Sequence, residues 1–143
     1  MSIVKKGESL LKKEQGTAKK ENFEQIFDAE GCPVRQILDR FSDKWSLLVL
    51  LVLNKKGILR FNELARLIGD VSQKMLTSTL RTLESNGLVS RKLYPEIPPR
   101  VEYRLTDLGK SMVPHVEALR QWAIANGDAI TKTRKKYEKA HSV

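Results

Sequence analysis

The segment from Phe61 to Leu108 constrains the fold of this chain more than any other part of the sequence. It begins with a short run in which apolar residues recur at helical spacing, and a Gly-Asp turn follows. A longer amphipathic run comes next and ends at Asn86-Gly87, where glycine commonly terminates a helix. Two β-prone runs, 88–94 and 101–105, then flank a Pro-rich tip that cannot pair as a central strand.

Helix, turn, second helix and β-ribbon, in that order, are the sequence pattern of a winged helix-turn-helix. We therefore predict an α+β fold, mainly α, built around this module. A small protein of this kind usually binds duplex DNA, with the second helix in the major groove. Double-stranded DNA is thus the first partner that the sequence predicts.

The helix predicted over 72–86 separates its residues onto two faces at about 100° per residue. The face predicted to be buried carries Met75, Leu76, Thr79, Leu80 and Leu83. The other face has hydrogen-bonding side chains and no acid, as a surface next to phosphates and base edges requires. The predicted DNA-binding residues are the N-cap Ser72, then Gln73, Lys74, Thr77, Ser78 and Arg81, with Thr82 on the same arc. The alternative is an ordinary amphipathic surface helix.

The β-ribbon adds four cations, Arg91, Lys92, Arg100 and Arg104. Arg91 and Arg100 are predicted to bind DNA, and Arg100, beside the Pro-rich tip, is the best candidate for a minor-groove or backbone contact. The alternative is that these cations only keep an exposed strand edge from aggregating.

Helices are also predicted before this module. Cys32-Pro33 opens one that runs to about Phe41, because proline suits a first helical turn. Ser42-Asp43 caps the next, over 44–53, which is apolar nearly all round and should be the central core helix. The buried stripe of the earlier helix is expected to be Val34, Ile37, Leu38 and Phe41.

Further boundaries follow from local signals. A strand over 58–61 precedes a short helix that Asn62 caps and that ends at Ile68. Thr106 caps a final helix over 106–128, inside which Pro114 predicts a kink or a restart.

The charge of the chain suits a polyanionic partner, and the alternative is a solvated surface with a lysine-rich tail. The net charge is +9, of which residues 31–130 carry +5 and residues 131–143 carry +4. No run of about 18 apolar residues exists and the N-terminus lacks the apolar region of a secretory signal, so we expect a cytoplasmic protein without a membrane partner. One cysteine and two distant histidines predict no disulfide within the chain, no metal site and no cofactor.

Three regions are predicted along the chain. Residues 1–21 form a disordered or frayed N-terminal extension, residues 22–130 form the winged domain with its terminal helices, and residues 131–143 form a basic C-terminal tail. Phe23, Ile26 and Phe27 lie at helical spacing and are expected to dock on the body of the protein or on a second subunit.

An ordered series of short motifs runs from Gly31 to Trp122. Its members are Cys32-Pro33-Val34, Lys44-Trp45, Arg60-Phe61-Asn62-Glu63-Leu64, Met75-Leu76 with Leu80, Leu83-Glu84, Gly87-Leu88-Val89, Arg91, Tyr94-Pro95, Pro98-Pro99-Arg100-Val101-Glu102-Tyr103, Leu105-Thr106 and Gly109. In this series the chain resembles the HxlR-type winged-helix regulators, relatives of the MarR-like group. It departs from them in the long lead before Cys32 and in Ser42-Asp43, where the family usually has two glycines.

The resemblance implies a homodimeric transcriptional regulator of a bacterial type that binds inverted-repeat promoter sites. Dimerisation would map onto the final helix, 106–128, with help from 22–28, so the flanking helices form a dimerisation region. A single winged helix of this size offers no obvious partner to one apolar stripe of the final helix, which a two-fold dimer would bury. Its members are Val116, Leu119, Trp122 and Ala123.

In some members of the family the cysteine at the position of Cys32 senses oxidants or electrophiles, so the resemblance makes Cys32 a redox-sensing candidate. A place at a helix N-terminus, with Arg35 one turn on, would lower the pKa of its thiol. A small-molecule or oxidant effector is therefore a partner that the sequence leaves open. The alternative is a buried packing residue before a helix-starting proline.

Other functions compete with this one. A protein-interaction module or a non-specific architectural DNA binder could use the same fold, although the acid-free polar arc and the cationic ribbon favour sequence-specific DNA binding. An enzyme is not predicted, because two histidines, one cysteine and no Gly-rich phosphate loop supply no catalytic constellation.

Overall fold

The computed structural model describes residues 28–29 and 32–142. They belong to two compact units, one ending at Ser42 and the other beginning at Asp43. The predicted extension over 1–21 and the stripe of Phe23, Ile26 and Phe27 lie outside the described residues. Across 28–29 and 32–142, no helix is both long and apolar enough to cross a membrane.

The described residues of the first unit, 28–29 and 32–42, form a small antiparallel pair and one helix. β1 (Asp28–Ala29) pairs with β2 (Cys32–Pro33), and α2 (Val34–Phe41) follows directly. The prediction that Cys32-Pro33 opens the helix was therefore wrong: Cys32 lies in an extended strand, as a residue before proline prefers. The predicted buried stripe was wrong at Leu38, which is 49% exposed, while the three other stripe residues are half-buried.

The second unit is built around α3 (Lys44–Lys56). Asp43 caps it by accepting a hydrogen bond of 3.0 Å from the backbone N–H of Ser46. Val49, Leu50 and Leu53 are buried, and the helix contacts α4, α5, α6 and β5. This confirms α3 as the central core helix.

α4 (Phe61–Ile68) begins two residues earlier than predicted. Its N-cap is Arg60, because the Glu63 side chain accepts a hydrogen bond of 3.1 Å from the Arg60 backbone N–H. The prediction of Asn62 as the cap was wrong, and Asn62 lies in the first turn. The strand before the helix is β3 (Leu59–Arg60), shorter than the predicted 58–61.

α5 (Gln73–Ser85) has the predicted boundaries. Ser72 caps it by accepting a hydrogen bond from the Met75 N–H, and Gly87 follows its end with a φ of 78°. Leu76, Leu80, Leu83 and Thr79 are buried as predicted, but Met75 is 45% exposed. Met75 lies about 100° round the helix from Leu76, at the margin of the buried arc.

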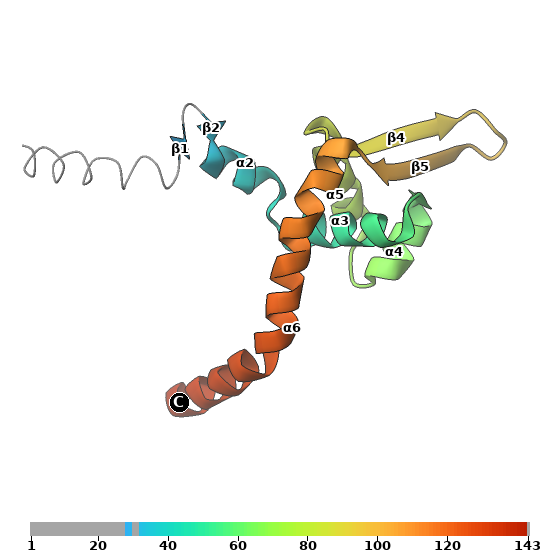
Figure 1. Ribbon diagram of the computed structural model, residues 1–143. Helices are drawn as coiled ribbons and strands as arrows, with labels where there is room; N and C mark the ends of the chain where they lie inside the picture. Colours follow the sequence, from blue (N-terminus) through green and yellow to red (C-terminus); the bar gives the residue numbers. More distant parts are fainter. Residues whose placement is uncertain (1–27, 30–31, 143) are drawn as a thin grey trace, which may run out of the picture. The chain divides into compact units, whose positions relative to one another are not determined.

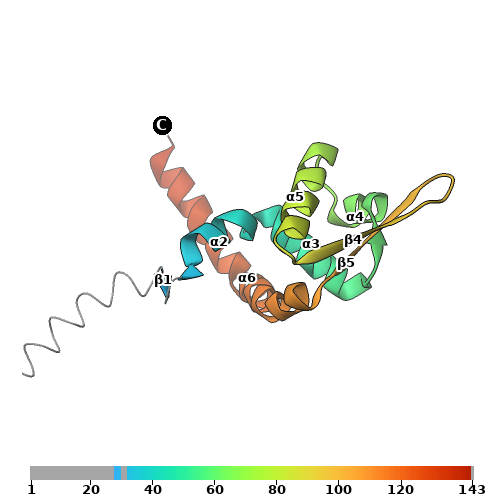
Figure 2. The same ribbon diagram turned by 90° about the horizontal axis from the view of Figure 1, so that it is seen from above.

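A three-stranded antiparallel sheet follows, in the order β3-β5-β4. β4 (Val89–Tyr94) and β5 (Arg100–Leu105) match the predicted strands to within one residue, and residues 95–99 connect them. Both views show the β4–β5 hairpin projecting away from the helices of this unit (Figure 1 and Figure 2). This hairpin is the wing.

α6 (Asp107–His141) is longer than the predicted 106–128 and runs through Pro114 without a restart. Thr106 caps it, and Val113 and Val116 are buried. Its red, C-terminal part changes direction in Figure 1. Residues 131–141, predicted as a separate basic tail, continue this helix, because Lys, Arg, Glu and Ala are good helix formers. The predicted domain boundaries themselves stay a prediction.

Of the two glycines in α6, Gly109 and Gly127, only Gly109 lies where an added side chain would not fit. A Cβ there would collide with the Leu88 carbonyl oxygen and lie 3.3 Å from Leu105 Cδ2. We expect Gly109→Ala to destabilise the fold by about 1–3 kcal/mol in thermal unfolding followed by circular dichroism. Gly127→Ala is the control, because a Cβ at Gly127 meets nothing within 4 Å, and we expect it to stabilise α6 slightly. Equal melting temperatures for the two variants would contradict this packing.

Candidate nucleic-acid interface

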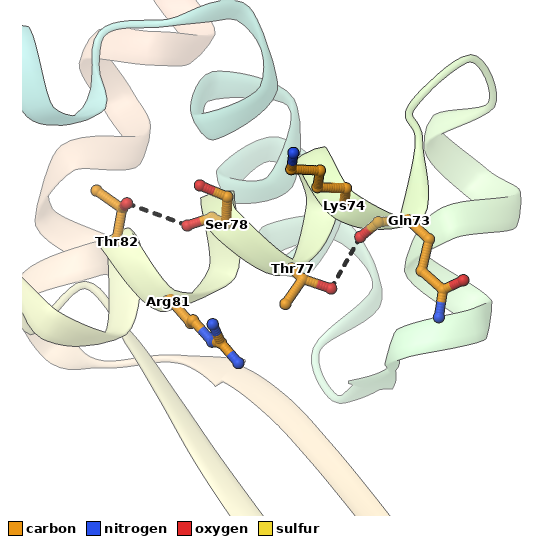
Figure 3. Close-up of a pocket in the computed structure, with 6 residues that line it drawn as sticks. All are labelled: Gln73, Lys74, Thr77, Ser78, Arg81 and Thr82. Atoms are coloured by element: carbon orange, nitrogen blue, oxygen red, sulfur yellow. Dashed lines mark hydrogen bonds between the residues drawn. The ribbon is translucent and has the colours of Figure 1, made fainter.

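The exposed face of α5 carries the predicted DNA-binding side chains in two parallel rows. One row is Gln73, Thr77 and Arg81, and the other is Lys74, Ser78 and Thr82, each spaced four residues apart (Figure 3). These six residues line an open groove of about 650 Å³. None of them is acidic, so the groove offers hydrogen-bond donors and cations without a carboxylate to repel a phosphate.

Two hydroxyl groups on this face are already engaged with the backbone. Thr77 Oγ1 donates to the Gln73 carbonyl at 2.8 Å, and Thr82 Oγ1 donates to the Ser78 carbonyl at 3.0 Å (Figure 3). Their methyl groups and remaining lone pairs are left for a partner. Gln73, Lys74, Ser78 and Arg81 are exposed, and their side chains form no ion pair within the described residues.

Arg81 links the helix to the wing. A second, more enclosed hollow of about 440 Å³ lies where α5 meets the sheet. Arg81 and Arg91 both line this hollow, so these two predicted DNA-binding residues share a continuous surface. Its lining residues are Thr77, Leu80, Arg81, Glu84, Arg91 and Tyr103.

Arg91 and Arg100 lie on opposite faces of the wing. Arg91 pairs with Tyr103 across the strands, and both line the hollow beside α5. Arg100 pairs with Tyr94 and, by strand alternation, faces the other side. The Arg100 side chain is only 28% exposed and forms ion pairs with Glu96 and Glu102.

Sequence reasoning missed the partners of Arg100. Glu96, Glu102 and Tyr94 each contact its guanidinium group. The signal that could have found two of them is the register of the hairpin, since it places Tyr94 opposite Arg100 and puts Glu102 on the same face.

A second exposed surface runs along α6. Val116 is 4% exposed and so packs inside its own chain, whereas Leu119 and Trp122 are 54% and 56% exposed, and Ala123 is also exposed. Within the described residues, the exposed apolar stripe therefore begins at Leu119 instead of Val116. It continues into a groove of about 550 Å³ lined by Trp122, Asn126, Ala129, Ile130, Thr133, Arg134 and Tyr137.

Glu117 and Arg120, also on α6, line a different hollow, together with residues of α3. Arg120 donates to both Glu117 carboxylate oxygens, at 2.6 to 3.0 Å, and this hydrogen bonding lowers the pKa of the Glu117 carboxyl group. The described ranges, 28–29 and 32–142, contain no cluster of three or more His, Cys, Asp or Glu side chains that could hold a metal ion.

The fold is shared with known regulators. The profile of the HxlR-like helix-turn-helix family matches residues 40–131. An HTH-type transcriptional regulator of Methanothermobacter thermautotrophicus is 52% identical over 91 residues, which are 64% of this chain and 69% of that protein.

Solved structures agree with the family match. The structure of the transcriptional regulator ytfH from Salmonella typhimurium is 40% identical, with a TM-score of 0.67 over 75% of this chain and 95% of that one. The structure of the redox regulator HypR in its oxidized form is 39% identical, with a TM-score of 0.61 over 66% of this chain and 97% of that one. Regulators of this kind are typically not enzymes. The chain therefore belongs to the HxlR-like helix-turn-helix family and is a DNA-binding transcriptional regulator.

Proposed function

We propose that this regulator recognises a specific inverted-repeat site in duplex DNA as a homodimer. The observation that carries the proposal is the acid-free face of α5, whose six side chains line one open groove. A helix with this face can enter the major groove, where hydrogen bonds to base edges distinguish the base pairs.

The two rows of α5 support different roles. Ser72 and Lys74 lie at the helix N-terminus, where backbone N–H groups and a positive end favour a phosphate. Gln73 and Thr77 lie one turn apart in one row and suit base edges, while Ser78 in the other row suits either a base or a phosphate. Arg81 can reach a guanine or a phosphate, and Arg91 extends this surface onto the wing.

The dimer interface that we propose lies on α6. Leu119, Trp122 and Ala123 are exposed in the single chain, and the apolar stripe continues through Ile130 to Tyr137. A second copy of the chain would bury this stripe, and a two-fold axis would place two α5 helices on successive major grooves. Val116 contributes to the core of its own chain instead.

A fluorescence-anisotropy titration tests specific recognition. The probe is duplex DNA from upstream of the protein's own gene, and a shuffled duplex of the same composition is the control. We expect the native duplex to bind about 10³-fold more tightly than the shuffled one, with affinity falling steeply as salt rises. Equal binding to both duplexes would instead favour a non-specific architectural protein, and salt-independent, weak binding would favour a protein-interaction module.

A second candidate function is a response to oxidants through Cys32. The similarity to a redox regulator solved in its oxidized form supports it, as does the presence of a single cysteine at the Cys-Pro motif. With no second cysteine in the chain, a switch needs a disulfide between two subunits, a mixed disulfide with a small thiol, or alkylation.

Cys32→Ser tests this response. We expect diamide to change the affinity of the parent protein for its specific duplex by about tenfold or more, which is a usual size for coupling between two sites. The serine variant should bind DNA like the reduced parent and ignore diamide, and a reducing agent should restore the treated parent. An unchanged diamide response in Cys32→Ser would exclude this cysteine as the sensor.

A further inference from the structure

The outer half of the wing carries a group of charged and aromatic side chains that contact one another. β3 pairs with β5 only at Tyr103 and Glu102, so the outermost pairs, Leu93 with Val101 and Tyr94 with Arg100, have no third strand. A two-stranded hairpin is marginally stable in water. Its conformation therefore depends on contacts between its own side chains.

Arg100 makes most of these contacts. Its Nη2 atom lies 3.3 Å from Glu96 Oε1, and its guanidinium carbon lies 4.1 Å from the centroid of the Tyr94 ring. Its Nε atom is buried and forms an ion pair with Glu102 Oε1 at 3.4 Å, a contact whose geometry falls short of a hydrogen bond. Lys92 Nζ lies 4.8 Å from the same Tyr94 ring.

These contacts connect three parts of the wing through side chains. Glu96 belongs to the connection between the strands, Tyr94 ends β4, and Glu102 lies within the three-stranded part of the sheet. One planar guanidinium group thus ties the tip, the end of one strand and the base of the wing together. A lysine could not reproduce the stacking and the two separate ion pairs with a single ammonium group.

Arg100 lies on the wing face opposite the one that adjoins α5. Arg91 and Tyr103 share the wing face beside Arg81, whereas Arg100, Tyr94 and Glu102 share the opposite face. With its cation paired to two carboxylates, Arg100 presents little free charge to a phosphate.

We propose that Arg100 is a positioning residue, which holds the outer wing in one conformation through Tyr94, Glu96 and Glu102, so that Arg91 and the wing tip meet DNA. This rests on the proposed function and replaces the sequence-based expectation that Arg100 itself contacts the minor groove. The wing tip carries Ile97, which is fully exposed.

The proposal predicts that Glu102→Gln weakens DNA binding, although the variant removes a negative charge. Removing a carboxylate beside DNA strengthens binding when only charge matters, because repulsion of phosphates falls. If Glu102 instead anchors Arg100, its neutral variant loosens the wing and weakens binding. We expect an affinity loss of about 3- to 10-fold, since the ion pair between Glu102 and the Nε atom of Arg100 is lost.

Two measurements on the full-length protein test the role of Arg100. Hydrogen exchange of the free protein reports the order of the outer wing at the amide groups of residues 92–94, 96–97 and 100–101, and anisotropy titrations at several salt concentrations report DNA binding. We expect Arg100→Lys and Glu102→Gln to speed exchange in the wing and to weaken DNA binding, with the slope of log affinity against log salt unchanged. Arg91→Gln is the matched control, and it should leave wing exchange unchanged while the magnitude of that slope falls by about 0.9.

The outcomes separate the two proposals. Arg100 is a direct phosphate contact, and the inference is overturned, if Arg100→Lys binds and exchanges like the parent and Glu102→Gln binds more tightly. Faster wing exchange in Arg100→Lys, together with a parent that binds no duplex specifically, would support the positioning of the wing and reject specific DNA recognition.

Discussion

Arg81→Ala is expected to weaken binding to the specific duplex by about 1–3 kcal/mol, or roughly 5- to 150-fold. Arg81 lies at the end of the row that begins at Gln73, and it shares the hollow between α5 and the wing with Arg91. It is exposed and forms no ion pair within the part of the chain that the structure describes. The variant should therefore keep the parent's melting temperature, so that the loss reports an interaction with DNA.

The salt dependence of the Arg81→Ala loss distinguishes its two possible contacts. If Arg81 contacts a phosphate, the slope of log affinity against log salt loses about 0.9, and the shuffled duplex weakens equally. If it reads a guanine, the loss is confined to the specific duplex. Lys139→Ala, which removes the same charge from the far end of α6, is the control and should change binding little. A melted variant, or one that binds both duplexes like the parent, would contradict the assignment of α5 as the recognition helix.

Elements with a local chemical signal could be predicted from the sequence. Asp43, Ser72 and Thr106 each cap a helix by accepting a hydrogen bond from a backbone N–H three residues on, so the capping residue and its donor are close in sequence. The polar face of α5 was predictable for the same reason, since helical spacing alone decides which side chains share it.

Features that depend on a second side chain, or on a residue that ends a helix only weakly, could not be predicted in this way. Arg60 caps α4 only because Glu63 reaches back to its N–H, and Asn62 offered a stronger residue preference. The end of α6 was misplaced because Gly127 does not stop a helix whose next residues favour helix formation. The contacts of Arg100 could not be predicted without the strand register, since its partners lie on both strands and in the connection between them.

Trp122→Glu is expected to have the largest effect on assembly. Trp122 is 56% exposed in the single chain and begins the groove that runs to Tyr137, so a carboxylate there should leave the monomer folded. In a dimer the same carboxylate would be buried against apolar side chains, which is costly. Sedimentation at micromolar concentration should show a dimer for the parent and a monomer for the variant.

The loss of the dimer should then appear in DNA binding. A dimer binds its second half-site as an intramolecular event, so a monomeric variant should lose about 10²-fold or more in affinity for the full inverted repeat. Its affinity for a single half-site should match that of the parent. Thr131→Glu is the control, because Thr131 lies about 180° round α6 from Trp122 and receives the same charge on the opposite face. If both variants stay dimeric, the stripe from Leu119 to Tyr137 is not the interface, since a buried carboxylate in its centre could not be tolerated.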